Sequence, residues 1–222
     1  MSNPPVLCYW DIRGLAQPIR LLLEYTGTKF EDKQLVCGPG PNYDKSVWTN
    51  EKHRLGLDFP NLPYFIDGDR KITQSNAILR YIARKHNLLG QTEEEQMRVD
   101  IMAEQSMDFR NGLVRLCYNT KSLTKVRMII WLPLVSKLDE FAKFLGDRPW
   151  FAGESLTFVD FIMYELLDQH RVFAPKSSIN PRKLVDYLNR FEKLPPIEAY
   201  MKSDRFMKRP LNNRMAKFGA EK

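Results

Sequence analysis

The sequence PVLCYWDIRG at residues 5–14, followed directly by LAQPIRLLLEYTG at residues 15–27, decides how the fold begins. Pro5 to Trp10 is a short apolar run that closes at Arg13-Gly14, which is typical of a buried strand. Apolar side chains then recur at helical spacing as far as Gly27, at Leu15, Ile19, Leu22 and Leu23. The chain therefore begins with a predicted strand and a predicted helix.

The rest of the first third also mixes strand and helix signals. Leu62–Ile66 and Lys71–Thr73 predict two strands, and the turn signal Asp67-Gly68-Asp69 between them makes an antiparallel hairpin. A helix is expected from Ser75 to about Asn87. The remaining expectations here are a weaker strand at residues 29–36 and a loop at the Gly and Pro residues of 37–41.

From Thr92 onward the pattern is helical. Thr92 and Glu95 form a capping box, which predicts the start of a long helix that runs toward Tyr118. Further helices are expected at residues 126–145 with a bend at Pro133, from residues 156–161, from Asn180-Pro181, and after Pro195-Pro196. The sequence thus predicts an α/β domain at residues 1–87 and an all-helical domain at residues 92–222.

Composition excludes several classes of protein. A chain of 222 residues with 43% hydrophobic residues can fill a substantial core. Its amino terminus lacks a basic segment followed by an apolar one, and the apolar run at residues 128–135 is too short to span a bilayer. We therefore expect neither secretion nor membrane insertion, and a cytoplasmic location.

The charged, cysteine and histidine residues argue against a nucleic-acid partner, a disulfide framework and a metal site. The net charge is +7, but the Lys and Arg residues are spread among acidic ones, so we expect no nucleic acid. Three scattered cysteines, Cys8, Cys37 and Cys117, argue against a disulfide framework or a zinc site. The histidines show no metal-ligand spacing, so no metal is expected; they are His53, His86 and His170.

Four motifs resemble members of the mu class of glutathione transferases. They are YWDIRG at residues 9–14, LGLDFPNLPY at 55–64, TQSNAI at 73–78 and RPWFAG at 148–153. The resemblance covers essentially the whole chain. It implies a thioredoxin-like domain with a four-stranded mixed sheet, an all-helical domain with the electrophile pocket and a C-terminal tail, and a homodimer. It also implies an enzyme that conjugates glutathione, its co-substrate, to hydrophobic electrophiles without a permanently bound cofactor.

The resemblance gives Tyr9 the catalytic role. An ordinary cysteine thiol has a pKa near ~8.5, and only its thiolate is a good nucleophile. A hydrogen bond from the Tyr9 hydroxyl to the thiolate, at roughly 1.5–3 kcal/mol, lowers the pKa of the thiol by ~1–2. Cys8 is a rival nucleophile, but alternation along a strand points Cys8 and Tyr9 to opposite faces, so we assign Cys8 to packing.

The resemblance also implies how glutathione is held. Gln74 and Ser75, at a helix start, bind its γ-glutamyl carboxylate. Leu62, before a cis Pro63, turns its backbone N–H and C=O toward the peptide-like middle of the ligand. The other expected contacts are Trp10, Lys45, Trp48, Lys52 and Asn61. Lys45 stands where mu-class enzymes usually carry arginine, so it keeps the charge but loses the planar fork.

Two further groups of residues follow from the same resemblance. The electrophile pocket is expected to be lined by Trp10, Leu15, Met107, Tyr118 and Asn213, with Tyr118 donating a hydrogen bond to developing negative charge. Asp108 is expected to reach glutathione bound to the neighbouring subunit. Phe59 is expected to insert into that subunit, since interfaces favour aromatic anchors.

Two other functions use the same features. A carrier would sequester bulky apolar ligands at the dimer cleft with little catalysis, although the intact Tyr9 motif argues against this as the sole function. Glutathione-dependent isomerisation or peroxide reduction would use the same thiolate. The residues alone do not separate these activities from conjugation.

Overall fold

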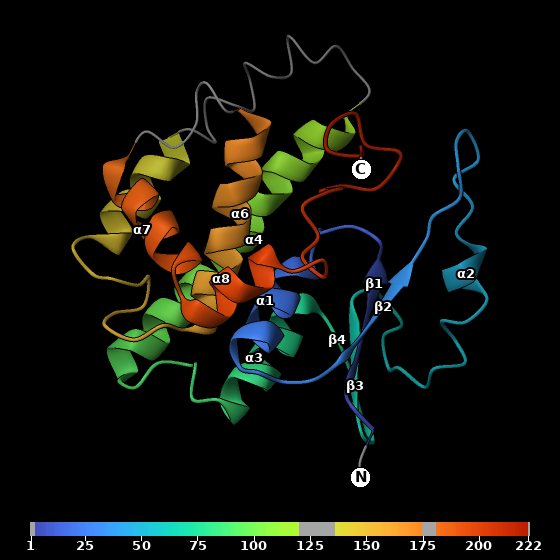
Figure 1. The fold of residues 1–222 in the computed structure, drawn as a ribbon, viewed down its shortest axis with the longest axis horizontal. Helices are drawn as coiled ribbons and strands as arrows, with labels where there is room; N and C mark the ends of the chain where they lie inside the picture. Colours follow the sequence, from blue (N-terminus) through green and yellow to red (C-terminus); the bar gives the residue numbers. More distant parts are fainter. Residues whose placement is uncertain (1–2, 120–135, 175–180, 222) are drawn as a thin grey trace.

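The computed structural model describes residues 3–119, 136–174 and 181–221. Its amino-terminal part contains a four-stranded mixed sheet in the order β2-β1-β3-β4 (Figure 1). The strands are β1 (Val6–Trp10), β2 (Glu31–Leu35), β3 (Tyr64–Asp67) and β4 (Arg70–Thr73). β1 is parallel to β2 and antiparallel to β3, and β3 pairs with β4 as the expected hairpin. The predicted mixed sheet is confirmed.

Helices α1 (Gln17–Tyr25) and α3 (Ser75–Lys85) lie between the sheet and the long helices (Figure 1). α1 forms because Pro18 is tolerated in the first turn and because Ile19, Leu22 and Leu23 share one buried face. A single helical turn, α2 (Ser46–Thr49), lies on the far side of the sheet, and the sequence analysis did not predict it.

The rest of the described chain is helical. It comprises α4 (Glu93–Tyr118), a helix at residues 136–145, α6 (Phe158–Phe173), α7 (Arg182–Glu192) and α8 (Pro195–Lys202). α6 is the centre of this part, because it packs against α1, α4 and α7 and is buried along nearly its whole length. The predicted helical region is confirmed, while the bend at Pro133 lies outside the described residues.

The start of α4 differs in one detail from the expected capping box. The Thr92 hydroxyl accepts the Glu95 N–H at 3.1 Å, as expected. The Glu95 carboxylate, however, accepts the N–H of Gln91 rather than that of Thr92, at 2.6 Å. Both bonds satisfy backbone donors at the helix entrance, so the helix is capped even though one partner has changed.

The chain after α8 returns to the sheet and to α4 (Figure 1). Arg13 and Gly14 donate backbone hydrogen bonds to Pro210 and Leu211, at 2.9 and 3.2 Å. Lys217 donates to the carbonyl of Cys117 near the end of α4, at 2.7 Å. The tail therefore joins the loop after β1 to the carboxyl end of α4. No helix in the described residues is long and apolar enough to cross a membrane.

Candidate functional site

Tyr9 lies near the end of β1, and the loop after the strand packs tightly on its ring. Gly14 in that loop has φ +40°, and a Cβ at this position would lie 2.6 Å from Tyr9 Cε1 and 2.8 Å from its hydroxyl oxygen. Only glycine leaves room for the ring and adopts this backbone conformation without cost. Gly14 therefore allows the loop to approach the Tyr9 ring and hydroxyl closely.

Cys8, the neighbour of Tyr9 in β1, belongs to the buried core. Its side chain is fully buried, and burial raises the pKa of its thiol. A thiol with a raised pKa is a poor nucleophile at neutral pH. This agrees with the assignment of Cys8 to packing.

A buried ion pair fixes the Tyr9 loop to α6. The Arg13 guanidinium donates to Glu165 and Asp168, each at 2.6 Å, and all three side chains are buried. Burial raises the pKa of Glu165, whereas for Asp168 Arg13 and Arg171 outweigh burial and lower the pKa. Glu165 and Asp168 follow Arg13 in the sequence by 152 and 155 positions. The cluster therefore holds the two parts of the chain together at the site.

Arg110 and Tyr118 lie on α4, and both interact electrostatically with Tyr9. Burial lowers the pKa of Arg110, and its electrostatic neighbours are Tyr9, Tyr118 and Glu165. Burial raises the pKa of Tyr118, so its hydroxyl remains protonated at neutral pH. The Tyr118 oxygen accepts the N–H of Asn213 at 2.8 Å, which leaves its own proton available as a donor.

A narrow gap beside this group brings together several of the expected residues. It has a volume of only about 10 Å³, and its lining includes Gly14, Leu15, Ser75, Met107 and Arg110. Leu15 and Met107 therefore both border this gap between the two parts of the chain, and their role in an electrophile pocket stays a prediction. Tyr118 and Asn213 contact each other at the carboxyl end of α4.

The residues expected at the γ-glutamyl end lie at the start of α3. Gln74 precedes the helix with φ 73°, a left-handed conformation that is rare for a residue other than glycine. Ser75 is the first helical residue and is buried. The free N–H groups of this helix terminus are suited to a carboxylate.

Three of the other expected glutathione contacts lie around α2: Lys45 comes directly before it, Trp48 lies in it and Lys52 follows it. Trp48 stacks on Tyr64 with ring centroids 6.1 Å apart. Lys45 is exposed and Lys52 is half-buried. Neither ammonium group forms an ion pair with a residue that the structure describes, so both charges remain available for an anion.

Leu62 follows Asn61 and precedes Pro63 through a cis peptide bond, as expected. Its backbone N–H, expected to face glutathione, instead donates to the Asn61 side-chain oxygen at 2.9 Å. Asn61 therefore occupies a donor that the ligand was expected to use. Binding of a peptide-like ligand here requires Asn61 to turn away or to share that donor.

The two residues expected to face a second subunit are both exposed. Phe59 is 77% exposed, the largest exposure among the large hydrophobic side chains of the described residues. Asp108 is exposed on α4. Both are accessible to a partner.

Comparison with known proteins identifies the family. Residues 5–84 match the glutathione S-transferase N-terminal domain, and residues 107–204 match the C-terminal domain. The chain is 57% identical over 219 residues to glutathione S-transferase Mu 5 of Mus musculus, covering 98% of this chain and 97% of the relative. It is 56% identical over 216 residues to glutathione S-transferase Mu 1 of Homo sapiens, covering 97% and 99%. This chain belongs to the mu class of the glutathione S-transferases.

A solved structure agrees with this assignment. The glutathione S-transferase Blo t 8 superposes with a TM-score of 0.87 at 34% identity, covering 96% of this chain and 99% of that one. The mu-class transferase described here is thus an enzyme that conjugates glutathione, its co-substrate, to electrophiles. The described residues contain no cluster of three or more His, Cys, Asp or Glu side chains able to hold a metal ion.

Sequence reasoning missed two features of this transferase. Arg110 follows Met107 by three positions on α4, so helical spacing could have placed both on one face. The pairing of Arg13 with Glu165 and Asp168 had no local signal, because its members lie more than 150 residues apart.

Proposed function

We propose that Tyr9 stabilises the glutathione thiolate in this transferase by donating a hydrogen bond from its hydroxyl. The observation that supports this most directly is the close approach of Gly14 to the Tyr9 ring and hydroxyl. A hydroxyl that is already positioned loses little freedom when it binds the sulfur. The cationic Arg110 nearby adds favourable potential for a negative sulfur.

We assign the remaining glutathione contacts to three groups. Gln74 and Ser75 bind the γ-glutamyl carboxylate, supported by the free helix terminus of α3. Leu62 binds the middle of the tripeptide, supported by its position before cis Pro63. The glycine carboxylate meets Lys45, Trp48 and Lys52, with Asn61 nearby, and the unpaired ammonium groups of the two lysines support this. Trp10 lies beside the sulfur in this proposal.

The electrophile occupies the space between Tyr9 and α4 in this proposal. Leu15 and Met107, which line the gap beside the Tyr9 loop, supply apolar surface. We assign Trp10 and Asn213 to the same electrophile pocket, and Asn213 bonds to Tyr118. Tyr118 donates a hydrogen bond to negative charge that develops on epoxides or conjugated carbonyls, which its protonated hydroxyl supports. Arg110 favours the same charge from the other side.

We further propose a homodimer in the cytoplasm, with residues 1–87 as the glutathione-binding domain and residues 92–222 as the electrophile domain. The exposure of Phe59 supports its role as an anchor in the partner subunit. Asp108 then reaches the γ-glutamyl amine of glutathione in the neighbouring site, which its exposure on α4 allows.

The role of Tyr9 is tested by titrating the thiolate absorbance of bound glutathione. In Tyr9→Phe the thiolate should appear at a pH higher by about 1–2, because the lost hydrogen bond is worth roughly 1.5–3 kcal/mol. Retention on immobilised glutathione checks that the variant still binds the tripeptide. An unchanged titration in a variant that is retained would exclude Tyr9 as the group that stabilises the thiolate.

A further inference from the structure

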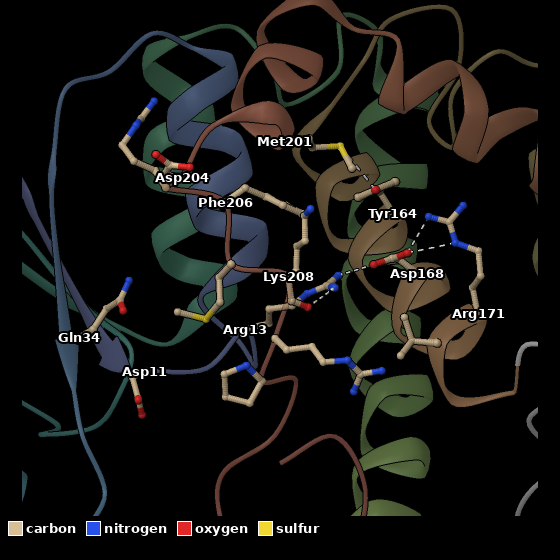
Figure 2. Close-up of a pocket in the computed structure, with 15 residues that line it drawn as sticks. Asp11, Arg13, Gln34, Tyr164, Asp168, Arg171, Met201, Asp204, Phe206 and Lys208 are labelled. Carbon is tan, nitrogen blue, oxygen red and sulfur yellow. Dashed lines mark hydrogen bonds and ion pairs between the residues drawn. The ribbon is translucent and has the colours of Figure 1, made fainter. Parts of the chain in front are cut away.

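Arg13 holds the first part of the C-terminal tail in place. Its backbone N–H donates to the Pro210 carbonyl at 2.9 Å, and its guanidinium donates to the Lys208 carbonyl at 3.4 Å (Figure 2). The next backbone N–H, that of Gly14, donates to the Leu211 carbonyl at 3.2 Å. The loop after β1 is thus bonded to the tail at three points, and Arg13 supplies two of these bonds.

The position of Arg13 is set in turn by two carboxylates of α6. Its guanidinium bonds to both oxygens of Glu165, from Nε at 3.0 Å and from Nη2 at 2.6 Å. The same Nη2 donates to Asp168 at 2.6 Å, and Arg171 donates to the other oxygen of Asp168 at 2.7 Å (Figure 2). A planar guanidinium with five N–H donors can make these bonds together, whereas the compact ammonium of a lysine cannot span them all.

The tail depends on such bonds more than Tyr9 does. Residues 203–221 form turns and bends and contain neither a helix nor a strand. Tyr9, in contrast, belongs to β1, which pairs with β2 on one side and with β3 on the other. Loss of the Arg13 side-chain bonds should therefore displace the tail and leave Tyr9 in place.

The tail reaches Tyr118 directly after the segment that Arg13 holds. The Asn213 N–H donates to the Tyr118 hydroxyl oxygen at 2.8 Å, and Asn213 is buried. Two residues separate Asn213 from Pro210, so a displacement at Pro210 is passed on to Asn213. Further along, the Lys217 N–H donates to a carbonyl near the end of α4, at 2.7 Å. The N–H that meets Tyr118 thus lies between one attachment to Arg13 and another to α4.

We propose that Arg13 is a positioning residue for the electrophile step. By binding α6 it holds the start of the tail so that the Asn213 N–H occupies the Tyr118 oxygen and the Tyr118 proton is directed at the substrate. This inference rests on the donor role proposed above for Tyr118. Arg13 itself is assigned no contact with glutathione or the electrophile and acts through the tail. A donor displaced by about 1 Å loses much of its effect on the rate.

Arg13→Lys in the full chain tests the proposal, because lysine keeps the positive charge and loses the planar fork. We expect kcat/KM for styrene oxide, an epoxide, to fall about fivefold relative to kcat/KM for chlorodinitrobenzene. The pH at which the thiolate of bound glutathione appears should not shift, because the charge is unchanged and the sheet still holds Tyr9. A shift of the thiolate titration with no change in the substrate ratio would overturn the proposal.

The same substitution in a Tyr118→Phe background shows whether Arg13 acts through Tyr118. Once the hydroxyl is gone, Arg13→Lys should change the substrate ratio by less than about 1.5-fold, because residues that act through one contact are not additive. A fivefold loss that persists in this background would overturn the proposal. Asp168→Asn removes one charged partner of Arg13 and keeps the shape, so it should lower the ratio about twofold and keeps the test decisive if Arg13→Lys does not fold.

Amide hydrogen exchange measures the tail independently of catalysis. In Arg13→Lys the amides of residues 210–213 should exchange about tenfold faster, whereas those of β1 should not change. If they do so and Tyr118→Phe nonetheless retains its substrate ratio, the donor role of Tyr118 is wrong and the proposal falls with it. Wild-type exchange of the tail in Arg13→Lys would overturn the proposal alone and leave the donor role of Tyr118 standing.

Arg98→Lys is the matched control. Arg98 also joins distant parts of the chain through a guanidinium, which donates to backbone carbonyls of residues 144–152 at 2.6–3.2 Å, but it lies near the amino end of α4, away from the tail. Arg98→Lys should lower the unfolding free energy and change neither the exchange of the tail nor the substrate ratio. The same changes in both lysine variants would show that a general loss of stability is the cause, which would overturn the proposal.

Discussion

The Tyr118 oxygen accepts a 2.8 Å hydrogen bond from the backbone N–H of Asn213, a residue 95 positions further along the chain. This bond joins the end of α4 to the C-terminal tail beside Tyr9. It also leaves the Tyr118 proton free to serve a substrate. Tyr118 thereby connects the position of the C-terminal tail to the proposed hydrogen bond with the electrophile.

Replacing Tyr118 with phenylalanine removes both functions of this hydroxyl. We expect kcat/KM for epoxides and conjugated carbonyls to fall roughly tenfold, because a donor to developing charge is lost. Activity with chlorodinitrobenzene should fall less. Tyr81→Phe is the matched control, since the Tyr81 hydroxyl bonds to Asp67 away from the site, at 2.7 Å. A proportional loss on all substrates in Tyr118→Phe would contradict the donor role.

Gly14→Ala tests the close approach to Tyr9. The new methyl group would meet the Tyr9 ring at 2.6 Å in a residue with φ +40°, so we expect a loss of about 2–4 kcal/mol in unfolding free energy. Gly68→Ala is the control, because Gly68 has φ +59° but no atom within 4 Å of its added Cβ. Its loss should be about 1 kcal/mol. Equal losses in urea unfolding would show that the Tyr9 contact is not tight.

His170 should make the protein sensitive to acid. Its ring stacks on Phe109 at 4.1 Å, its Nδ1 lies 2.6 Å from the Leu166 carbonyl, and burial lowers its pKa to about 4. In the unfolded chain His170 binds a proton near pH ~6.5, whereas the folded protein resists this proton until the pH is near 4. The free energy of unfolding is therefore highest above pH ~6.5 and falls by about 3 kcal/mol as the pH is lowered to 4.

Urea unfolding at a series of pH values measures this loss. His170→Leu should weaken the pH dependence between about 6.5 and 4 by roughly 3 kcal/mol relative to the wild type. The exposed His53 provides the control variant His53→Leu, which should retain the wild-type dependence. A His170→Leu protein with the wild-type pH profile would show that another group causes the acid sensitivity.

Phe59→Ser should weaken the proposed dimer. Truncating an aromatic anchor costs about 2 kcal/mol, and the substitution removes one anchor from each subunit, so the dimer dissociation constant should rise by roughly two to three powers of ten. Sedimentation at several protein concentrations measures this shift. Val36→Ser removes another exposed apolar side chain, 52% exposed, and should leave the dimer unchanged. Equal dissociation constants for Phe59→Ser and the wild type would exclude Phe59 as the anchor.

Lys52→Ala should raise the KM for glutathione about tenfold with little change in kcat, because a ground-state contact to a carboxylate is lost. Lys45→Ala should have a smaller effect, since Lys45 is exposed whereas Lys52 is half-buried. Lys29→Ala removes an exposed lysine elsewhere and is the control. A fall in kcat without a change in KM would contradict a role confined to binding.

Local patterns predicted most elements of the fold correctly. The apolar run that became β1 and the turn at Gly68 that joins β3 to β4 both depend on neighbouring residues. The single turn α2 was missed because four residues are too few to show a helical period. Glu95 changed partner because Gln91 and Thr92 both offer a backbone donor at that helix entrance.

The amino-acid order alone was sufficient to predict the mixed sheet, the helical part and the mu-class family, and to select Tyr9 as the candidate for activating glutathione. Strand alternation and helical spacing are short-range properties, so they can be read from the chain. Packing established which distant groups lie near the Tyr9 loop: Arg110 on α4, the α6 carboxylates that pair with Arg13, and the pair of Tyr118 with Asn213. These contacts form only when α6 and the tail close on the loop after β1, and no local pattern encodes that closure.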